Sequence, residues 1–413
     1  MESNSRRDFL RATSRVASSS AIALTAASYS RVLGANENVN LGVIGVGDRG
    51  TWVMSLFQNR PGVRVVAVCD IYGEHIASAK QKAPEAKEFS DHRKLLDLRE
   101  VDAVLIATPD HWHSIIAIDA LNAGKDVYVE KPLTRRIDEG PPIVKAAREN
   151  HRICQVGMQQ RSGKHYLEAK EKYFDSGKLG AVTLARTWWY GNGAHLRKAP
   201  ASLQTQPKDL DWAHFLGPVK WRDYDPQQYA NWRAYLDFGG GQVTDLFTHW
   251  IDVVHMFMGK DIPFSASAAG GIYKYRDGRT APDTINVLLQ YPDPHEFTAT
   301  FEATLVPGIK GEGIEMCGTD GRLWIDRSRY EYYPTGSKEP AEVVKAEALP
   351  GTRDSLTQDH VNNFLECLRS RTLPNGDVLI GHRSAQASHL GNISYEQRRR
   401  IDFDITGEEI LPL

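Results

Sequence analysis

Short apolar runs alternate with amphipathic stretches of helical length over the first third of the chain. The runs contain few polar residues, so we expect strands that are buried on both faces. The expected strands cover 39–44, 63–69, 101–107, 126–130 and 153–156, and the expected helices cover 51–59, 114–122 and 137–150. Strands that alternate with helices predict a parallel sheet with helices on both faces, a doubly wound α/β domain.

The pattern changes after Gly157. Helices are expected over 164–174 and 242–258, a strand over 181–190, and a long, aromatic-rich irregular stretch over 191–235. A loop of that length inside a compact domain is usually functional. Alternating apolar and polar residues then predict strands at 264–275, 284–291, 296–305, 313–317 and 321–326. We expect an α+β domain with a large, mostly antiparallel sheet that leaves one face open.

Two amphipathic helices are expected near the end of the chain, over 357–370 and 383–395, and we expect them to pack back on the first domain. The predicted division of the chain is a leader at 1–35, the doubly wound α/β domain at 36–156, the α+β domain at 157–345, and C-terminal helices at 346–413.

The leader has the features of an export signal. Arg6 and Arg7 precede an apolar pair, and a weakly hydrophobic stretch rich in Ala and Ser follows from Ala17 to Ala27. Small residues near Ala27 or Ala35 offer cleavage points. The pattern is typical of a twin-arginine signal and predicts a periplasmic or secreted protein. A disordered basic tail is the alternative interpretation.

Composition narrows the possible partners. The 413 residues contain 50 Lys plus Arg and 52 Asp plus Glu, so the net charge of −2 gives no reason to expect nucleic acid. No apolar stretch reaches the roughly 20 residues of a membrane span. The 4 Cys residues are scattered without a C-x-x-C pair, so neither a metal cluster nor a disulfide framework is expected.

A glycine motif follows the first expected strand. Residues 45–50 read GVGDRG, a G-x-G-x-x-G sequence that opens a helix. The next strand ends at Asp70, where a Rossmann domain needs an acid for the ribose 2′-hydroxyl. A carboxylate there would repel a 2′-phosphate, so NAD is favoured over NADP. A glycine-rich turn in an unrelated α/β domain is the alternative.

Two more polar segments lie at expected strand ends, where ligands of such sheets bind. They are the TPDHWH sequence at 108–113 and Glu130-Lys131-Pro132. In the second half, a triple glycine at 239–241 precedes a helix with Asp245 and His249. These two residues are four positions apart, so they share one helix face and can touch.

Together these motifs resemble the Gfo/Idh/MocA oxidoreductases, which include glucose–fructose oxidoreductase and inositol dehydrogenase. The matching pieces are 45–50, Ala107-Thr108-Pro109-Asp110, Glu130-Lys131-Pro132, and Asp245-x-x-x-His249. The likeness covers nearly everything after the leader. The family often has Asn where Asp110 stands.

The resemblance implies that Lys131 and His249 face the substrate beside the nicotinamide and that Asp245 assists them in acid–base chemistry. Such an arrangement suits oxidation of a secondary alcohol, which needs a base for the hydroxyl proton while hydride leaves. The predicted cofactor contacts are Gly45, Gly47, Asp48, Arg49, Gly50, Asp70, Thr108, Pro109, His113, Glu130 and Lys131. The predicted substrate contacts are Arg161, Tyr190 and Trp232.

Several of these residues have plainer interpretations. Lys131 could be a solvated turn lysine, and Asp245 with His249 a surface pair. A structural salt bridge suits Arg161 equally well. Aromatic residues such as Tyr190, Trp188 and Trp232 are more often core than sugar platforms. His111 and His113 with Asp110 could suggest a metal, but two histidines are too few, and we expect none.

Export would change the reaction cycle, because we expect no pool of NAD outside the cytoplasm. We therefore expect NAD to be bound tightly and regenerated in place. Three routes fit: coupled turnover of two sugars, a redox-neutral glycosidase or lyase reaction through transient sugar oxidation and elimination, and an external electron acceptor. We favour an oxidoreductase acting on a sugar, inositol or related polyol, assembled as a homodimer or homotetramer. A non-catalytic sugar-binding protein is the alternative from another class.

Overall fold

Six parallel strands form the first sheet of the computed structural model, which describes residues 38–347 and 355–412. The strands run in the spatial order β3-β2-β1-β4-β5-β6, so the direction of winding reverses between β1 and β4. Their bounds are β1 Val39–Ile44, β2 Val63–Cys69, β3 Lys87–Phe89, β4 Ala103–Ile106, β5 Asp126–Val129 and β6 Cys154–Val156. Ligands of such sheets bind beyond the carboxyl ends at that reversal.

Helices cover both faces of this sheet, which confirms the predicted doubly wound α/β fold. The helices are α2 Asp48–Gln58, α3 Gly73–Lys82, α4 His92–Leu96, α5 Asp110–Asn122 and α6 Gly140–Glu149. β3, α3 and α4 were not anticipated, because β3 is a polar edge strand of 3 residues and the two helices lack a strong apolar stripe. The predicted leader lies outside the described residues.

Ten strands form the second sheet, in the order β14-β13-β12-β11-β7-β10-β9-β8-β15-β16. Every neighbouring pair is antiparallel except β7 with β10, as expected for a mostly antiparallel sheet. The strands are β7 Val182–Tyr190, β8 Ser265–Gly271, β9 Thr284–Tyr291, β10 Phe297–Thr304, β11 Glu312–Gly318, β12 Gly321–Ile325, β13 Arg329–Pro334, β14 Glu342–Lys345, β15 Ile401–Asp404 and β16 Glu409–Ile410.

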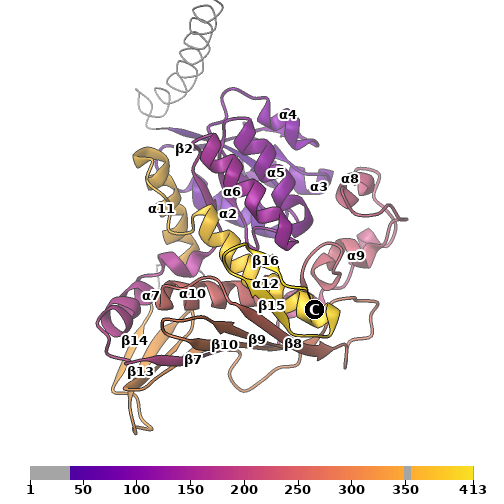
Figure 1. The fold of residues 1–413 in the computed structure, drawn as a ribbon. Helices are drawn as coiled ribbons and strands as arrows, with labels where there is room; N and C mark the ends of the chain where they lie inside the picture. The colour runs from indigo at the N-terminus through magenta and orange to yellow at the C-terminus, as the bar shows by residue number, and fades with distance from the viewer. Residues whose placement is uncertain (1–37, 348–354, 413) are drawn as a thin grey trace, which may run out of the picture.

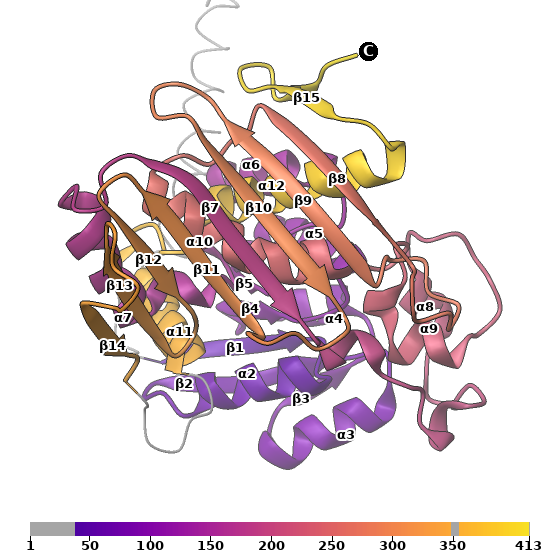
Figure 2. The ribbon, with the colours of Figure 1, turned by 90° about the horizontal axis from the view of Figure 1, so that it is seen from below.

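One face of this large sheet is covered and the other is open. Buried and half-buried residues alternate strictly along β10, as they do in a sheet with one packed face. Seen from below, the strands lie in front of the helices (Figure 2). The covering helices are α7 Lys164–Ala169, α10 Thr248–Met258 and α12 Val378–Gln397. In Figure 1, α10 and α12 lie between the large sheet and the first domain.

The helix α11 Ser355–Ser370 joins the core of the first domain from the far end of the chain. Its apolar side chains Val361, Phe364 and Leu365 share one buried cluster with Phe57 of α2. A segment from the end of the sequence therefore completes the core beneath β1 and β2.

The stretch 191–235 is largely irregular, as expected, with two short helices, α8 Trp212–Leu216 and α9 Pro226–Ala230. We refer to it as the insertion. It lies beside α3 and the first domain (Figure 1). The amide of Gly73 donates to the Asp209 carbonyl at 3.1 Å, and that of Asp211 donates to the Ile71 carbonyl at 3.0 Å. These bonds hold the insertion against the carboxyl end of β2.

No helix within residues 38–347 and 355–412 has the length and apolar character needed to cross a membrane.

Candidate active site

The glycine loop between β1 and α2 is shaped by its lack of side chains. Gly45 has φ +84°, which favours glycine, and a Cβ on it would lie 2.7 Å from backbone atoms of Ala107 and Thr108. A Cβ on Gly50 would lie 1.8 Å from the carbonyl oxygen of Gly45. The loop therefore packs tightly against the sheet and presents the N-terminus of α2, a binding place for phosphate groups.

The carboxylate of Asp70 lies directly beside this loop. It accepts hydrogen bonds from the amides of Val46 at 2.8 Å and Tyr72 at 3.0 Å. The His75 ring lies 3.3 Å away. Burial lowers the pKa of His75, but its contact with Asp70 outweighs burial, and the pKa is raised overall. These bonds hold the Asp70 carboxylate beside the glycine loop, and its contact with the ribose stays a prediction.

Three further predicted cofactor contacts pair with other protein groups. Arg49 donates from Nε to the buried Glu130 at 2.8 Å and stacks on Trp52 with its guanidinium carbon 4.6 Å from the ring centre. Asp48 is exposed at the start of α2 and pairs with Arg197 of the insertion at 2.9 Å. The insertion is therefore tied to the glycine loop itself.

His113 was expected to contact the cofactor, and the structure corrects this. Its Nδ1 lies 2.7 Å from the Pro132 carbonyl and its Nε2 lies 2.9 Å from the Thr108 carbonyl. Both ring nitrogens are occupied, so the ring joins two loops and has no nitrogen left for a ligand. Of the other two predicted contacts in this segment, Pro109 is the N-cap residue of α5. The buried hydroxyl of Thr108 has no hydrogen-bond partner among the described residues.

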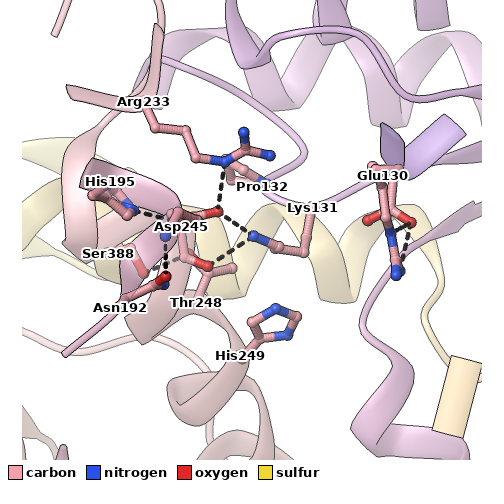
Figure 3. Close-up of polar contacts among 12 residues, drawn as sticks. Glu130, Lys131, Pro132, Asn192, His195, Arg233, Asp245, Thr248, His249 and Ser388 are labelled. Carbon is pink, nitrogen blue, oxygen red and sulfur yellow. Dashed lines mark hydrogen bonds and ion pairs between the residues drawn. The ribbon is translucent and has the colours of Figure 1, made fainter. Parts of the chain in front are cut away.

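Lys131 and Asp245 meet across the interface between the two domains (Figure 3). Lys131 Nζ donates to Asp245 Oδ1 at 2.5 Å and to the Asp245 carbonyl at 2.8 Å. Both side chains are largely buried, with 12% and 11% of their surfaces exposed. Lys131 is therefore not a solvated turn residue, and Asp245 is not part of a surface pair.

Asp245 and His249 share a helix face but do not bond to each other. Asp245 lies in a π-helical turn, Val243–Phe247, which leads into α10, and a π turn is wider than an α turn. His249 instead places Nδ1 3.1 Å from Gln160 Oε1. In this arrangement Nδ1 carries the proton of the neutral ring, and Nε2 is a proton acceptor.

The electrostatic environment separates the roles of these groups. Burial raises the pKa of Asp245, but Lys131, the hydrogen bond from His195 and Arg233 outweigh burial and hold it well below its usual range. Burial, with Lys131 and Arg327, lowers the pKa of His249 well below its usual value. At neutral pH the site thus contains a carboxylate and an uncharged imidazole.

Two residues of the insertion that contact Asp245 are not predicted from the sequence. His195 Nε2 lies 2.8 Å from Asp245 Oδ2, and Arg233 Nε lies 3.6 Å from Asp245 Oδ1 (Figure 3). His195 is almost fully buried, and burial lowers its pKa, so it donates as a neutral ring. The length of the insertion indicated function, but no motif marks either residue.

Asp110 adds a second buried carboxyl group near the first. It begins α5, is 4% exposed, and makes no side-chain hydrogen bond among the described residues. Burial, with the charge of Asp245, raises the pKa of Asp110 to about 8. The two carboxyl groups therefore differ in charge at neutral pH.

The three predicted substrate contacts have different positions. Arg161 donates from Nε to the buried Asp252 at 2.8 Å, so it is a structural ion pair beneath α10. Tyr190 lies on the open face of the large sheet and bonds to Glu302 at 3.0 Å, which corrects its placement in the site. Its neighbour Trp189 faces inward, with ring centres 6.2 Å from His249, because side chains alternate along a strand.

Trp232 is the one predicted substrate residue that stays at the site. Its ring lies beside Gly239, as does the carboxyl group of Asp110. The guanidinium carbon of Arg233 lies 4.1 Å from the centre of the same ring.

No group of three His, Cys, Asp or Glu side chains within 38–347 and 355–412 is arranged to hold a metal. His111 instead places Nε2 2.8 Å from the Phe215 carbonyl, which joins α5 to the insertion.

Comparison with known proteins decides the family. The sequence profile described as "Oxidoreductase family, NAD-binding Rossmann fold" of the GFO_IDH_MocA group matches residues 39–158, and "GFO/IDH/MocA C-terminal domain" matches residues 212–324. The chain belongs to the Gfo/Idh/MocA family. Its first domain is an NAD-binding Rossmann domain, as predicted.

Curated Gfo/Idh/MocA relatives include two kinds of enzyme. Inositol 2-dehydrogenase of Salmonella typhimurium is 31% identical over 180 residues, which are 42% of this chain and 53% of that protein. The α-N-acetylgalactosaminidase of Shewanella oneidensis is 33% identical over 140 residues, 32% of this chain and 30% of that protein. The chain thus spans about half the length of the first and less of the second.

Solved structures share the fold over most of the chain. Levoglucosan dehydrogenase in complex with NADH superposes with a TM-score of 0.69 at 18% identity, and covers 88% of this chain and 99% of its own. The two-domain arrangement of this chain is therefore shared with that enzyme.

Proposed function

We propose that the protein is an NAD-dependent oxidoreductase that moves hydride between a secondary alcohol of a sugar, inositol or related polyol and NAD. The observation that carries this proposal is the buried cluster of Lys131, Asp245 and His249 at the edge of the NAD-binding domain. The similarity of the chain to inositol 2-dehydrogenase supports the same class of reaction.

The residues around the glycine loop fit the cofactor. Gly45 and Gly50 leave room only for backbone, so phosphate oxygens can approach α2 closely. Asp70 offers a carboxylate to ribose hydroxyl groups and disfavours a 2′-phosphate. When bound, NAD accepts or returns the hydride.

The side chains of the cluster would handle the proton and the developing charge. His249, neutral and with Nε2 unprotonated, accepts the hydroxyl proton of the alcohol. The Lys131 ammonium donates to the same substrate oxygen as it gains negative charge. Asp245 orients the Lys131 side chain, and His195 fixes the carboxylate from its other oxygen.

A direct test combines a substrate screen with one substitution. Purified protein is incubated with NAD and a panel of polyols, inositols and sugars, and NADH formation is followed. Lys131→Met should abolish NADH formation while NAD still binds. Full activity of this variant, or sugar binding with no turnover by the parent protein, would contradict the assignment and favour a binding protein.

A second candidate is a redox-neutral glycosidase or lyase. Two observations favour it: the similarity to α-N-acetylgalactosaminidase, and Asp110 as a protonated acid able to donate to a leaving group. In that reaction, transient oxidation acidifies the neighbouring C–H bond, a base removes its proton, and the leaving group departs with a proton. For a glycosidase, water then adds to the unsaturated intermediate before hydride returns, whereas for a lyase the double bond remains in the product. The test is to incubate the protein with glycosides in deuterium oxide. Release of the sugar with deuterium incorporated at the neighbouring carbon, and without net formation of NADH, would establish this reaction.

We also propose that residues 1–35 are a twin-arginine signal and that the protein reaches the periplasm or exterior with NAD bound. The Arg6-Arg7 pair and the Ala- and Ser-rich stretch after it support this proposal. Protein purified from the periplasm and extensively dialysed should release stoichiometric NAD or NADH on denaturation. Empty protein that binds NAD weakly would contradict retention, and cytoplasmic protein would contradict export.

Self-association through the open face of the large sheet is the remaining proposal. That face has an aromatic groove of about 670 Å³ lined by Trp188, Tyr190 and Trp324, with the fully exposed Ile309 beside it. Sedimentation equilibrium should give a dimer or tetramer, and Ile309→Asp should shift it toward the monomer. A monomeric parent protein would exclude the proposal.

A further inference from the structure

Two arginine side chains flank the cluster of Lys131, Asp245 and His249, and each stacks on a tryptophan. The guanidinium carbon of Arg233 lies 4.1 Å from the ring centre of Trp232, and that of Arg327 lies 4.6 Å from the ring centre of Trp189. Trp189 in turn lies against His249. Arg233 belongs to the insertion and Arg327 follows β12, so the two guanidinium groups reach the site from different segments of the chain.

Neither arginine is satisfied by the protein around it. The nearest carboxylate oxygens are 3.6 Å from Arg233 Nε and 3.8 Å from Arg327 Nε, beyond hydrogen-bond distance. Within residues 38–347 and 355–412, neither guanidinium donates a hydrogen bond, and Arg327 Nε is buried without a partner. Figure 3 shows the terminal nitrogens of Arg233 directed away from Asp245.

Arg233 shares its counterion, Asp245, with the closer Lys131. The carboxylate of Asp245 is already engaged by Lys131 at 2.5 Å and by His195 at 2.8 Å. The other nearby carboxyl group, Asp110, is uncharged at neutral pH, since burial raises its pKa to about 8. Two cationic side chains thus face one carboxylate, and an anion that enters the site meets a net positive charge.

A stacked guanidinium is suited to one kind of anion. The Trp232 ring fixes the plane of Arg233, so less side-chain entropy is lost when the fork binds. A carboxylate is planar and presents two oxygens that match parallel N–H groups. Trp232 and Trp189 add apolar surface of the kind on which a sugar ring packs.

We propose that the substrate of this site is an acidic sugar, a hexuronic or aldonic acid, whose carboxylate is bound by Arg233 while its hydroxyl group faces Lys131 and His249. The oxidation of this substrate rests on the proposed function, whereas the binding of its carboxylate by Arg233 does not. Arg233 belongs to the substrate side of the site, because it contacts Asp245, whereas the arginine of the insertion that reaches the glycine loop is Arg197.

The test compares matched substrates on the intact protein. Values of kcat/KM are measured with NAD for hexuronic acids, for the neutral hexoses of the same configuration and for their 6-phosphates. The uronic acid should be preferred over the hexose by about 100-fold, as expected for a charge-assisted bidentate contact. Arg233→Gln should reduce this ratio to nearly one, and Arg233→Lys should leave an intermediate ratio. A ratio cancels any loss that is common to both substrates.

The matched control is Arg222→Gln. Arg222 also lies in the insertion beside an aromatic ring, Phe238 at 5.8 Å, but it is saturated by Asp237 at 2.5 Å. The substitution Arg222→Gln should leave the ratio of kcat/KM for uronic acid to kcat/KM for hexose unchanged. An equal or greater preference for the neutral hexose, a preference for the phosphate, or an unchanged ratio in Arg233→Gln would overturn the proposal. Weaker NAD binding by Arg233→Gln would do the same, since the arginine would then serve the cofactor.

Calorimetry separates this inference from the proposed function. Uronate that binds in an Arg233-dependent manner without any NAD reduction would contradict the proposed oxidoreductase and leave the acidic ligand standing. Neutral sugars that are oxidised in a Lys131-dependent manner as well as acidic ones would support the function and overturn the acidic substrate.

Discussion

The glycine loop and the cluster of Lys131, Asp245 and His249 are built from different parts of the chain: backbone in the loop, and side chains in the cluster. The loop is made of backbone from one hexapeptide, and its shape depends on the absence of side chains at Gly45 and Gly50. The cluster is made of side chains from two segments, and Lys131 and Asp245 are 114 positions apart. The loop therefore has no room for an added atom at these two positions, whereas the cluster is held by the pairing of opposite charges.

The largest expected effect is on the charge-dependent cluster. Lys131→Met removes the ammonium that donates to Asp245 and, in the proposed reaction, to the substrate oxygen. We expect kcat to fall by about 10³-fold with little change in NAD affinity. Stopped-flow and equilibrium titration measure the two quantities. The exposed Lys145 is the control, and Lys145→Met should behave as the parent protein. Similar kcat values for both variants would contradict the assignment.

The matching change in the loop adds one methyl group. Gly50→Ala would place a carbon 1.8 Å from the Gly45 carbonyl, so the loop must move away from the sheet. We expect the Kd for NAD to rise by about 100-fold, through a displacement of the kind that costs that much in preorganised sites. Gly311→Ala has open space at the new carbon and is the control. Unaltered NAD binding by Gly50→Ala would show that the loop is not the nucleotide site.

A smaller effect is expected where the insertion supports the cluster. His195→Ala removes the hydrogen bond to Asp245 Oδ2, and loss of such a supporting contact commonly costs about 10-fold or more. The fall should lie in kcat rather than in KM, and His195→Gln, which can still donate, should recover part of it. His214→Ala, in the same insertion, should leave both constants unaltered. Equal losses in the Gln and Ala variants would argue against a positioning role.

Asp110 gives a pH-dependent test of the charge balance. Its pKa is raised to about 8, so the folded chain holds this proton more tightly than the unfolded chain does. Its contribution to stability is therefore lost as the pH rises from about 4 to about 8. Asp110→Asn should have a melting temperature above that of the parent by a few degrees at pH 8.5 and about equal to it near pH 4. A constant difference across this range would mean that Asp110 ionises normally.

The smallest effect tests which neighbour on β7 faces the site. Trp189→Ala should lower kcat/KM several-fold, because its ring packs against His249 and Arg327. Tyr190→Ala should leave kcat/KM within about twofold, as substitutions away from a site usually do. Steady-state kinetics on both variants decide the matter, and the reverse result would place the substrate on the open face.

The same comparison explains what the sequence could predict. The doubly wound domain, the glycine loop, Asp70, Lys131, Asp245 and His249 were all accessible, because each lies in a local pattern tied to one strand end or one helix. The edge elements β3, α3 and α4 were not, since short polar segments lack a periodic signal.

The remaining residues of the site depend on tertiary structure. His195, Arg233 and Gln160 approach Asp245 and His249 only after the insertion and the second domain have folded. The choice of Tyr190 over Trp189 failed by one position, which reverses the face of a strand. The π-helical turn that separates Asp245 from His249 likewise leaves no mark in the sequence.

The helix α11 has a consequence for the order of events in the cell. The first domain lacks Val361, Phe364 and Leu365 of its core until residues close to the end of the chain have been translated. Domains at the N-terminus usually fold while synthesis continues, but this one cannot complete its core until α11, which follows β7 to β14 in the sequence, has left the ribosome. The core of the NAD-binding domain is therefore completed only after most strands of the second domain have been synthesised, and removal of α11 should destabilise the NAD-binding domain.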